Sequence, residues 1–295
     1  MTPRSLRLAA LLLGLMAATA GVLHAQHQPR ERSAAAAQAQ VLSYGTDPLQ
    51  AIDYYPATAR NAPLVVFVHG GGWKRGDKAM VRGSTKMKDW HARGYAVAAV
   101  NYRLAPAATV ENQAEDVAAA IALLKSDAAR LGHDGARIAL AGHSAGAHLV
   151  ALVSTDPKWL RRAGLPMDAV RGVIALDGAG YDVPTQMGRN ALLLGDTYEQ
   201  AFGTDPARQR ALSPTAHGAT PNAPAFLILH VQRADSKAQS EALAAALRRA
   251  GTPVEVHAMQ GTGLQGHAEI NRRLGEPDYP ATPMVDGWLA EVLAR

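Results

Sequence analysis

The stretch that decides the fold is RIALAGHSAGAH, residues 137–148. A mostly apolar run leads into Gly-x-Ser-x-Gly, and an Ala-, Leu- and Val-rich segment follows at once, which is the order strand, sharp turn, helix. Such a turn strains the serine backbone and brings strand and helix almost into contact, so only glycine fits two residues before and after the serine. Gly142 and Gly146 fill these positions. The pattern predicts that Ser144 is exposed at a helix N-terminus as a nucleophile for carbonyl attack.

Composition bounds the class of protein. The chain has 295 residues, of which 48% are hydrophobic and 19% charged, enough to bury a large core in one domain. It contains no cysteine, which excludes disulfides, thiol catalysis and cysteine-based metal clusters. The net charge of +5 is spread along the chain and gives no indication of a nucleic-acid partner.

The first residues differ from the rest. Arg4 and Arg7 precede an apolar run over 8–20, and small residues follow at 18–20 and at Ala25. This pattern is typical of a secretory signal peptide over residues 1–25, so we expect an exported protein, periplasmic or secreted. The apolar run is short for a bilayer span, so stable membrane insertion is not expected. Residues 26–55 are predicted to be a flexible segment that precedes a catalytic domain over 56–295.

Buried strands and helices are predicted to alternate through that domain. Apolar runs without alternation, typical of strands buried on both faces, occur at 64–68, 95–100, 170–176, 225–231 and 254–258. Helical patterns occur at 84–93, 111–131, 240–250 and 281–293. This order predicts one doubly wound α/β domain with a mostly parallel sheet and helices on both faces. Residues 179–222 lose the pattern and are predicted to form a small cap.

A serine nucleophile needs a base and a carboxylate, and in open α/β sheets both lie on loops after strands. His267 and Asp235 are the candidates, because the order Ser, Asp, His is typical of α/β-hydrolases. Glu269 and Asp182 remain rival acids. The glycine-rich stretch 261–266 is interpreted as a supple loop that lets His267 reach Ser144. Its Gly-x-Gly-x-x-Gly spacing has no following strand and does not predict a nucleotide.

Oxyanion donors are predicted at a second glycine-rich turn. His69-Gly70-Gly71-Gly72 follows a buried strand, and glycines there let successive amides point at one spot. We predict Gly71, Gly72 and the amide of Ala145 as donors, with His69 and Trp73 as structural supports. Spacings such as His-x-x-x-His are missing from the sequence, so no metal and no cofactor is predicted.

Taken together, these motifs resemble the α/β-hydrolase superfamily. The resemblance rests on 69–73, 101–106, 142–146, the Asp235 loop and 266–271, and is nearest to hormone-sensitive-lipase-like esterases and bacterial feruloyl-esterase and arylformamidase-like carboxylesterases. It implies a cofactor-free carboxylesterase that cleaves a small-molecule ester through an acyl-enzyme, with Ser144, Asp235 and His267 as triad and Gly71, Gly72 and Ala145 as oxyanion hole.

Two other functions stay open from the sequence. One is hydrolysis of an amide or formamide by the same machinery, and the other is a non-catalytic binding protein of this fold. The acyl group, the alcohol and the oligomeric state are not predicted, because the substrate pockets depend on the poorly patterned cap.

Overall fold

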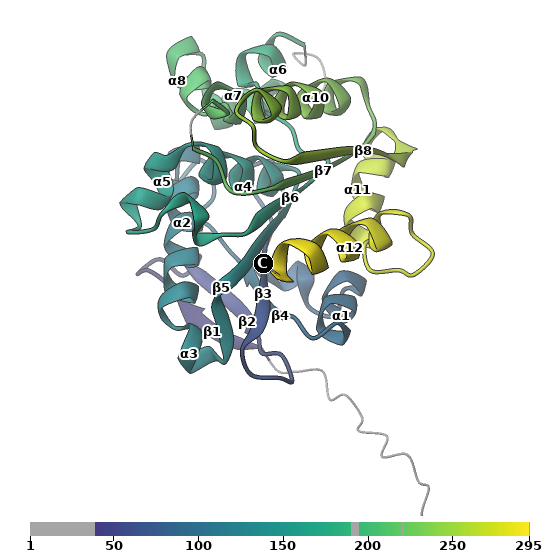
Figure 1. Ribbon diagram of the computed structural model, residues 1–295. Coiled ribbons are helices and arrows are strands. Elements are labelled where there is room, and N and C mark those ends of the chain that lie inside the picture. The colour runs from purple at the N-terminus through teal and green to yellow at the C-terminus, as the bar shows by residue number, and fades with distance from the viewer. Residues whose placement is uncertain (1–38, 190–194, 220, 295) are drawn as a thin grey trace, which may run out of the picture. The chain divides into compact units, whose positions relative to one another are not determined.

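The computed structural model describes residues 39–189, 195–219 and 221–294, and in this part of the chain a single sheet has helices on both faces (Figure 1). Its strands are β1 (Gln40–Ser43), β2 (Ala51–Tyr55), β3 (Ala62–Val68), β4 (Ala96–Val100), β5 (His133–His143), β6 (Gly172–Leu176), β7 (Phe226–Gln232) and β8 (Val254–Thr262). Its α-helices are α1 (Thr85–Ala92), α2 (Val110–Ser126), α3 (Ala128–Leu131), α4 (Ala145–Thr155), α5 (Pro157–Arg162), α6 (Val183–Arg189), α7 (Gly195–Phe202), α8 (Pro206–Ala211), α9 (Pro214–His217), α10 (Ala234–Arg249), α11 (Gly263–Arg273) and α12 (Ala281–Ala294).

The strand order is β1-β2-β4-β3-β5-β6-β7-β8. The pairs β1·β2 and β2·β4 are antiparallel, and every pair from β4·β3 to β7·β8 is parallel. All residues of β4 and β6 are buried, as expected for apolar strands covered on both faces. The predicted doubly wound α/β fold is therefore confirmed. Parallel strands end at the same edge, so the loops after β3, β5, β6, β7 and β8 meet there.

Two apolar cores lie on opposite faces of the sheet. One packs α2, α4 and α10 against alternate strand residues such as Val66 and Leu140, and the other packs α1, α11 and α12 against their neighbours, such as Val65 and Ala139. In Figure 1 the two groups of helices flank the sheet. The rigid sheet between them fixes the positions of the loops at its carboxyl edge.

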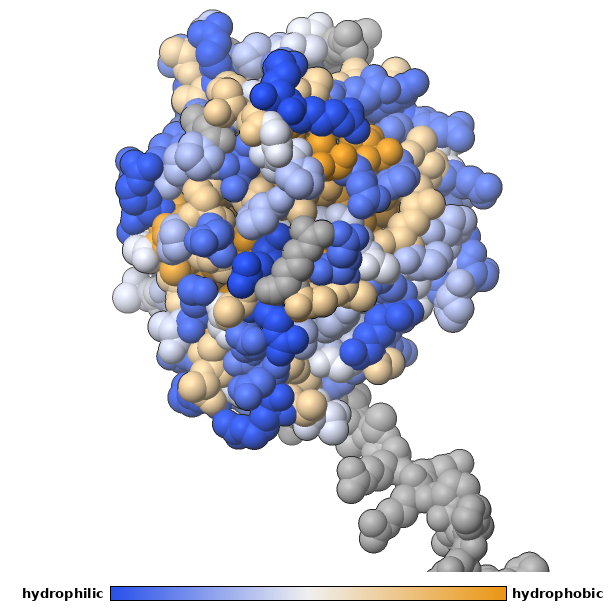
Figure 2. All heavy atoms as spheres, in the orientation of Figure 1, coloured by the Kyte–Doolittle hydropathy of each residue, from blue (hydrophilic) through white to orange (hydrophobic). Residues whose placement is uncertain are grey.

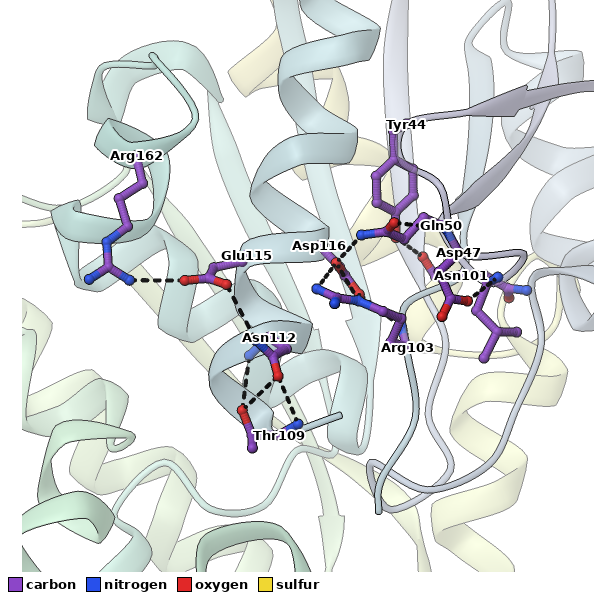
Figure 3. Close-up of polar contacts among 11 residues, drawn as sticks. Tyr44, Asp47, Gln50, Asn101, Arg103, Thr109, Asn112, Glu115, Asp116 and Arg162 are labelled. Carbon is purple, nitrogen blue, oxygen red and sulfur yellow. Dashed lines mark hydrogen bonds and ion pairs between the residues drawn. The ribbon is translucent and has the colours of Figure 1, made fainter. Parts of the chain in front are cut away.

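The flexible segment predicted over 26–55 is wrong for residues 40–55, which form β1 and β2. A buried carboxylate anchors the connection between these strands. Asp116 on α2 accepts bonds from Arg103 (2.7 Å from Nη2) and from Gln50 Nε2 (2.8 Å), and Tyr44 donates to the carbonyl of Asn101 (Figure 3). The predicted signal peptide lies outside the described residues.

The predicted cap corresponds to helices α6 to α9, which connect β6 to β7. Its neck is held by hydrogen bonds. The carbonyl of Tyr181 accepts bonds from the amide (3.0 Å) and hydroxyl (2.8 Å) of Thr215. The amide of Asp182 donates to Gln239 Oε1 on α10 (2.7 Å). We call residues 178–182 the neck of the cap below.

The face seen in Figure 2 is mostly hydrophilic, and its strongly hydrophobic atoms gather in hollows, most visibly beside β7 and β8. Large apolar side chains that are exposed in the described residues are Val41, Met80, Leu264 and Met284. Over the same residues, none of the helices has the length and apolar character that a membrane span requires.

Candidate active site

Ser144 lies at the turn between β5 and α4, with φ 56° and ψ −120°. A positive φ is rare for a residue with a side chain and marks a strained turn. Added Cβ atoms would lie 2.4 Å from the carbonyl oxygen of Gly146 at Gly142, and 2.1 Å from that of Val68 at Gly146. The predicted need for glycine at both positions is confirmed, because strand and helix leave no room for a methyl group.

The imidazole of His267 bonds a carboxylate at the end of β6. His267 Nδ1 lies 2.6 Å from Asp177 Oδ2, and Asp177 Oδ1 accepts bonds from the amide of Val231 (3.0 Å) and the hydroxyl of Ser236. Burial alone would raise the pKa of Asp177, but the bond from His267, the charge of Arg233 and the bond from Ser236 lower it to about 2. The carboxylate is thus ionised at neutral pH and accepts a hydrogen bond from His267 Nδ1, which leaves Nε2 on the opposite side of the ring.

Asp235, the predicted acid, is not the partner of the imidazole, and Asp177 holds that position instead. Asp235 lies in the first turn of α10, where it contacts Gln186 (3.5 Å) and Arg233 (3.6 Å). Arg233 Nη2 also lies 3.5 Å from Asp177 Oδ2, so one guanidinium contacts both acids. The prediction failed because β7 passes directly into α10, leaving no loop to carry Asp235 to the histidine.

Two further details differ from the sequence expectation. β8 extends to Thr262, and α11 begins at Gly263, so His267 stands in the first half of a helix and not on a supple loop. Glu269, one of the rival acids, bonds Gln265 on the same helix (3.1 Å). The other rival, Asp182, caps the start of α6 by accepting from the amide of Thr185 (3.2 Å).

His143, next to the nucleophile, positions α11. Its Nε2 lies 2.8 Å from the carbonyl of His267, and the two rings are 4.5 Å apart. Burial, followed by the nearby charge of His267, lowers the pKa of His143 to about 3, so the ring is neutral and Nε2 donates its proton to that carbonyl. Sequence analysis assigned no function to His143, although its position inside Gly-x-Ser-x-Gly places it close to His267.

The glycine turn after β3 adjoins the nucleophile. A Cβ added at Gly70 would lie 3.0 Å from Ser144 Cβ, and Gly71 and Gly72 have φ values of +132° and +62°. Among the described residues, no acceptor pairs with the amides of Gly71, Gly72 or Ala145, and the last of these is at the first turn of α4, where helices leave amides unbonded. These amides are available to an oxyanion.

The predicted supports of this turn are buried. His69 stacks on Tyr102 with ring centres 4.4 Å apart, and the Tyr102 hydroxyl donates to the His69 carbonyl (3.0 Å). Trp73 is 2% exposed and its carbonyl accepts a bond from Gln113 Nε2 (2.7 Å). No group of three or more His, Asp or Glu side chains in the described ranges is arranged to hold a metal ion.

An elbow serine after β5, a histidine after the last strand and a buried aspartate, on a sheet of this order, define the α/β-hydrolase fold. Solved structures agree. Esterase B from Lactobacillus Rhamnosis has a TM-score of 0.69, 20% identity and coverage of 86% of this chain and 84% of its own. A thermophilic esterase from Thermogutta terrifontis, solved with butyrate bound, has a TM-score of 0.68, 23% identity and coverage of 86% and 94%.

Sequence comparison gives a narrower resemblance. The BD-FAE family model matches residues 52–161. Esterase LipC of Mycobacterium tuberculosis is 32% identical over 203 residues, which are 64% of this chain and 49% of LipC. The chain therefore spans about half the length of that relative. The predicted resemblance to α/β-hydrolase carboxylesterases is confirmed.

Proposed function

We propose that the chain is a serine hydrolase that cleaves small carboxylic esters through an acyl-enzyme, with Ser144 as nucleophile, His267 as base and Asp177 as acid. The observation that carries the proposal is the hydrogen bond from His267 to an ionised, fully buried Asp177, next to a serine held in a strained turn. The backbone connects these groups directly, because the amide of Ser144 donates to the carbonyl of Leu176 (3.0 Å), the residue before Asp177.

The proposed reaction has two halves. Ser144 Oγ attacks the ester carbonyl while His267 Nε2 takes its proton, and the amides of Gly71, Gly72 and Ala145 bind the oxyanion. The intermediate collapses, and the leaving alkoxide takes the proton from His267. Water then attacks the acyl-enzyme, again giving a proton to His267, and the second collapse releases the carboxylic acid as the proton returns to Ser144. No cofactor takes part.

Asp177 contributes through the imidazolium that each half forms. Its carboxylate fixes the tautomer with the proton on Nδ1 and stabilises the positive ring. Arg233 beside this carboxylate moderates its charge, and Ser236 and Val231 fix its orientation.

The substrate is proposed to be a small-molecule ester, with no nucleic-acid partner and no stable membrane insertion. The name of the LipC relative supports an ester substrate, and the butyrate in the Thermogutta terrifontis structure supports a short acyl group. Residues 1–25 are proposed to be a signal peptide and the mature protein to be periplasmic or secreted. Mass spectrometry of the protein recovered from the producing cells tests this proposal, because it identifies the first residue of the mature chain.

A fluorophosphonate probe tests the proposed nucleophile. The wild type should be labelled on Ser144 and Ser144→Ala should remain folded but unlabelled, with hydrolysis of p-nitrophenyl butyrate reduced by about a millionfold, as for other triad nucleophiles. Absence of labelling in the wild type would favour the binding-protein alternative. Faster turnover of matched formamides or anilides than of esters would favour the amide hydrolase.

A further inference from the structure

We propose that His148 is a positioning residue that joins the cap to the glycine turn at residues 70–72, called the oxyanion turn below. In this way it keeps the amides of Gly71 and Gly72 in place during catalysis. This inference rests on the proposed function for its catalytic part. The mechanism above does not use His148, and neither does the sequence pattern, which places it only on the helix that follows Ser144.

His148 makes three directed bonds from the first turns of α4. Its amide donates to the carbonyl of Ser144 (3.1 Å), its Nε2 lies 2.9 Å from the carbonyl of Leu212, and its Nδ1 lies 3.3 Å from Trp73 Nε1. The indole nitrogen can only donate and a carbonyl can only accept. The bonds therefore fix one neutral tautomer, with the proton on Nε2 and the lone pair on Nδ1.

These partners belong to different parts of the molecule. Leu212 lies between the cap helices α8 and α9, and Trp73 is the residue after the three glycines of the oxyanion turn. Trp73 itself has φ 60°, so its backbone is held in a conformation that a residue with a side chain rarely adopts. A bond to its side chain helps to maintain that conformation, and with it the orientation of the preceding amides.

Aromatic packing reinforces the same connection. The Trp73 ring lies 4.7 Å from Phe202 and 5.7 Å from Tyr198, both on α7, and His148 lies 5.3 Å from Phe202. Helix α7 also reaches the turn directly, since a Cβ at Gly72 would lie 2.9 Å from Thr197 Cγ2. His148 is fully buried at the centre of this cluster. An apolar side chain would fill the space but leave the Trp73 N–H and the Leu212 carbonyl without partners.

The test compares four single variants and the double variant of the first two. His148→Leu removes both side-chain bonds, Trp73→Phe removes only the indole donor, and His148→Gln retains an amide able to accept and donate. Leu152→Ala is the matched control, because it removes buried apolar atoms from the same helix, and so destabilises the fold, but leaves both side-chain bonds of His148 in place. The readouts are kcat, KM, the unfolding midpoint, and the affinity for a trifluoromethyl ketone, which forms an oxyanion adduct with the serine.

We expect His148→Leu and Trp73→Phe to lower kcat by about tenfold to a hundredfold and to weaken binding of the trifluoromethyl ketone by the same factor. KM should change by less than about threefold, as when an oxyanion donor is displaced. The double variant should lose no more than the larger single loss, because both act through one bond. His148→Gln should recover most of the activity. Unchanged kcat in both single variants, or a loss that Leu152→Ala reproduces at equal stability, would overturn the proposal.

A second measurement does not depend on activity. The indole N–H of Trp73 should exchange slowly with solvent in the wild type and at least about tenfold faster in His148→Leu, while Leu152→Ala leaves it protected. Equal exchange in wild type and His148→Leu would refute the bond itself. If the protection behaves as expected but the wild type hydrolyses no ester, the network stands and the proposed function fails.

Discussion

Replacing Asp177 by asparagine tests the proposed acid with almost no change in shape. The orientation of the new amide is determined by its surroundings. Two donors, the amide of Val231 and the hydroxyl of Ser236, face Oδ1, so this position must keep the oxygen. The NH₂ group then takes the place of Oδ2, which lies 2.6 Å from His267 Nδ1.

An NH₂ group at that position reverses the hydrogen bond. His267 Nδ1 must accept, so its proton moves to Nε2, the nitrogen that has to take the proton of Ser144. The positive imidazolium also loses its negative partner. In serine proteases the equivalent change lowers kcat by about 10⁴. For Asp177→Asn we expect a loss of at least about a thousandfold, or about 4 kcal/mol of transition-state stabilisation.

The assay is hydrolysis of p-nitrophenyl butyrate at about pH 8, with Asp235→Asn as the control. Asp235 contacts the same Arg233 but not His267, so its variant should keep kcat within about tenfold of the wild type. Thermal unfolding of both variants checks that the fold is retained. If Asp235→Asn is the crippled enzyme and Asp177→Asn is active, the reasoning from the His267 contact is refuted.

Three other changes have defined outcomes. Gly146→Ala should destabilise the fold by about 3 kcal/mol or more, because its methyl group would overlap the Val68 carbonyl; an unfolding free energy equal to wild type would contradict the close contact. Gly71→Ala, with φ +132° and a Cβ 1.9 Å from the Arg75 carbonyl, should distort the turn and lower kcat by about a hundredfold with a smaller effect on KM, which steady-state kinetics would show or disprove. Burial lowers the pKa of His143 to about 3 and that of His148 to about 4, whereas the pKa of a histidine in the unfolded chain is about 6.5. At pH values between these limits the unfolded chain binds more protons than the folded chain, so the free energy of unfolding falls as the pH falls below about 6.5. Each ring should lower the free energy of unfolding by about 2 kcal/mol between about pH 7 and about pH 5. Denaturant titrations should show that this loss is about 2 kcal/mol smaller in His148→Gln than in the wild type; an identical pH dependence in wild type and variant would exclude the contribution of His148.

The elbow could be predicted from the sequence because its determinants are local. Gly142, Ser144 and Gly146 lie within five residues, and the steric reason for each glycine depends only on the strand and helix that they join. The alternation of apolar runs likewise predicted the parallel part of the sheet, since full burial of strands such as β4 and β6 leaves no polar side. The cap was located by the loss of that alternation, without its helices.

The acid could not be chosen in this way. Asp177 and Asp235 each follow an apolar strand, and the sequence does not reveal how far a strand continues or whether a helix begins immediately after it. The useful signal was the position of Asp177 directly at the end of its strand, where a positive φ of 42° is tolerated by aspartate. The strands β1 and β2 were missed for a related reason, because tertiary bonds such as Gln50 to Asp116 hold them in place.

The position of the acid immediately before the neck of the cap has a consequence for engineering. In this chain the proposed acid Asp177 and the cap leave the sheet through the same connection. Exchange of the cap for that of another esterase would therefore have to begin after Asp182 and end before Thr215, so that the bonds of Tyr181 and Asp182 continue to hold the backbone that carries Asp177. A chimaera joined at Gly178 would disturb the proposed acid as well as replace the cap. The turn between β7 and α10 is no substitute as a place for insertions, because Val231, Arg233 and Ser236 contact the same carboxylate.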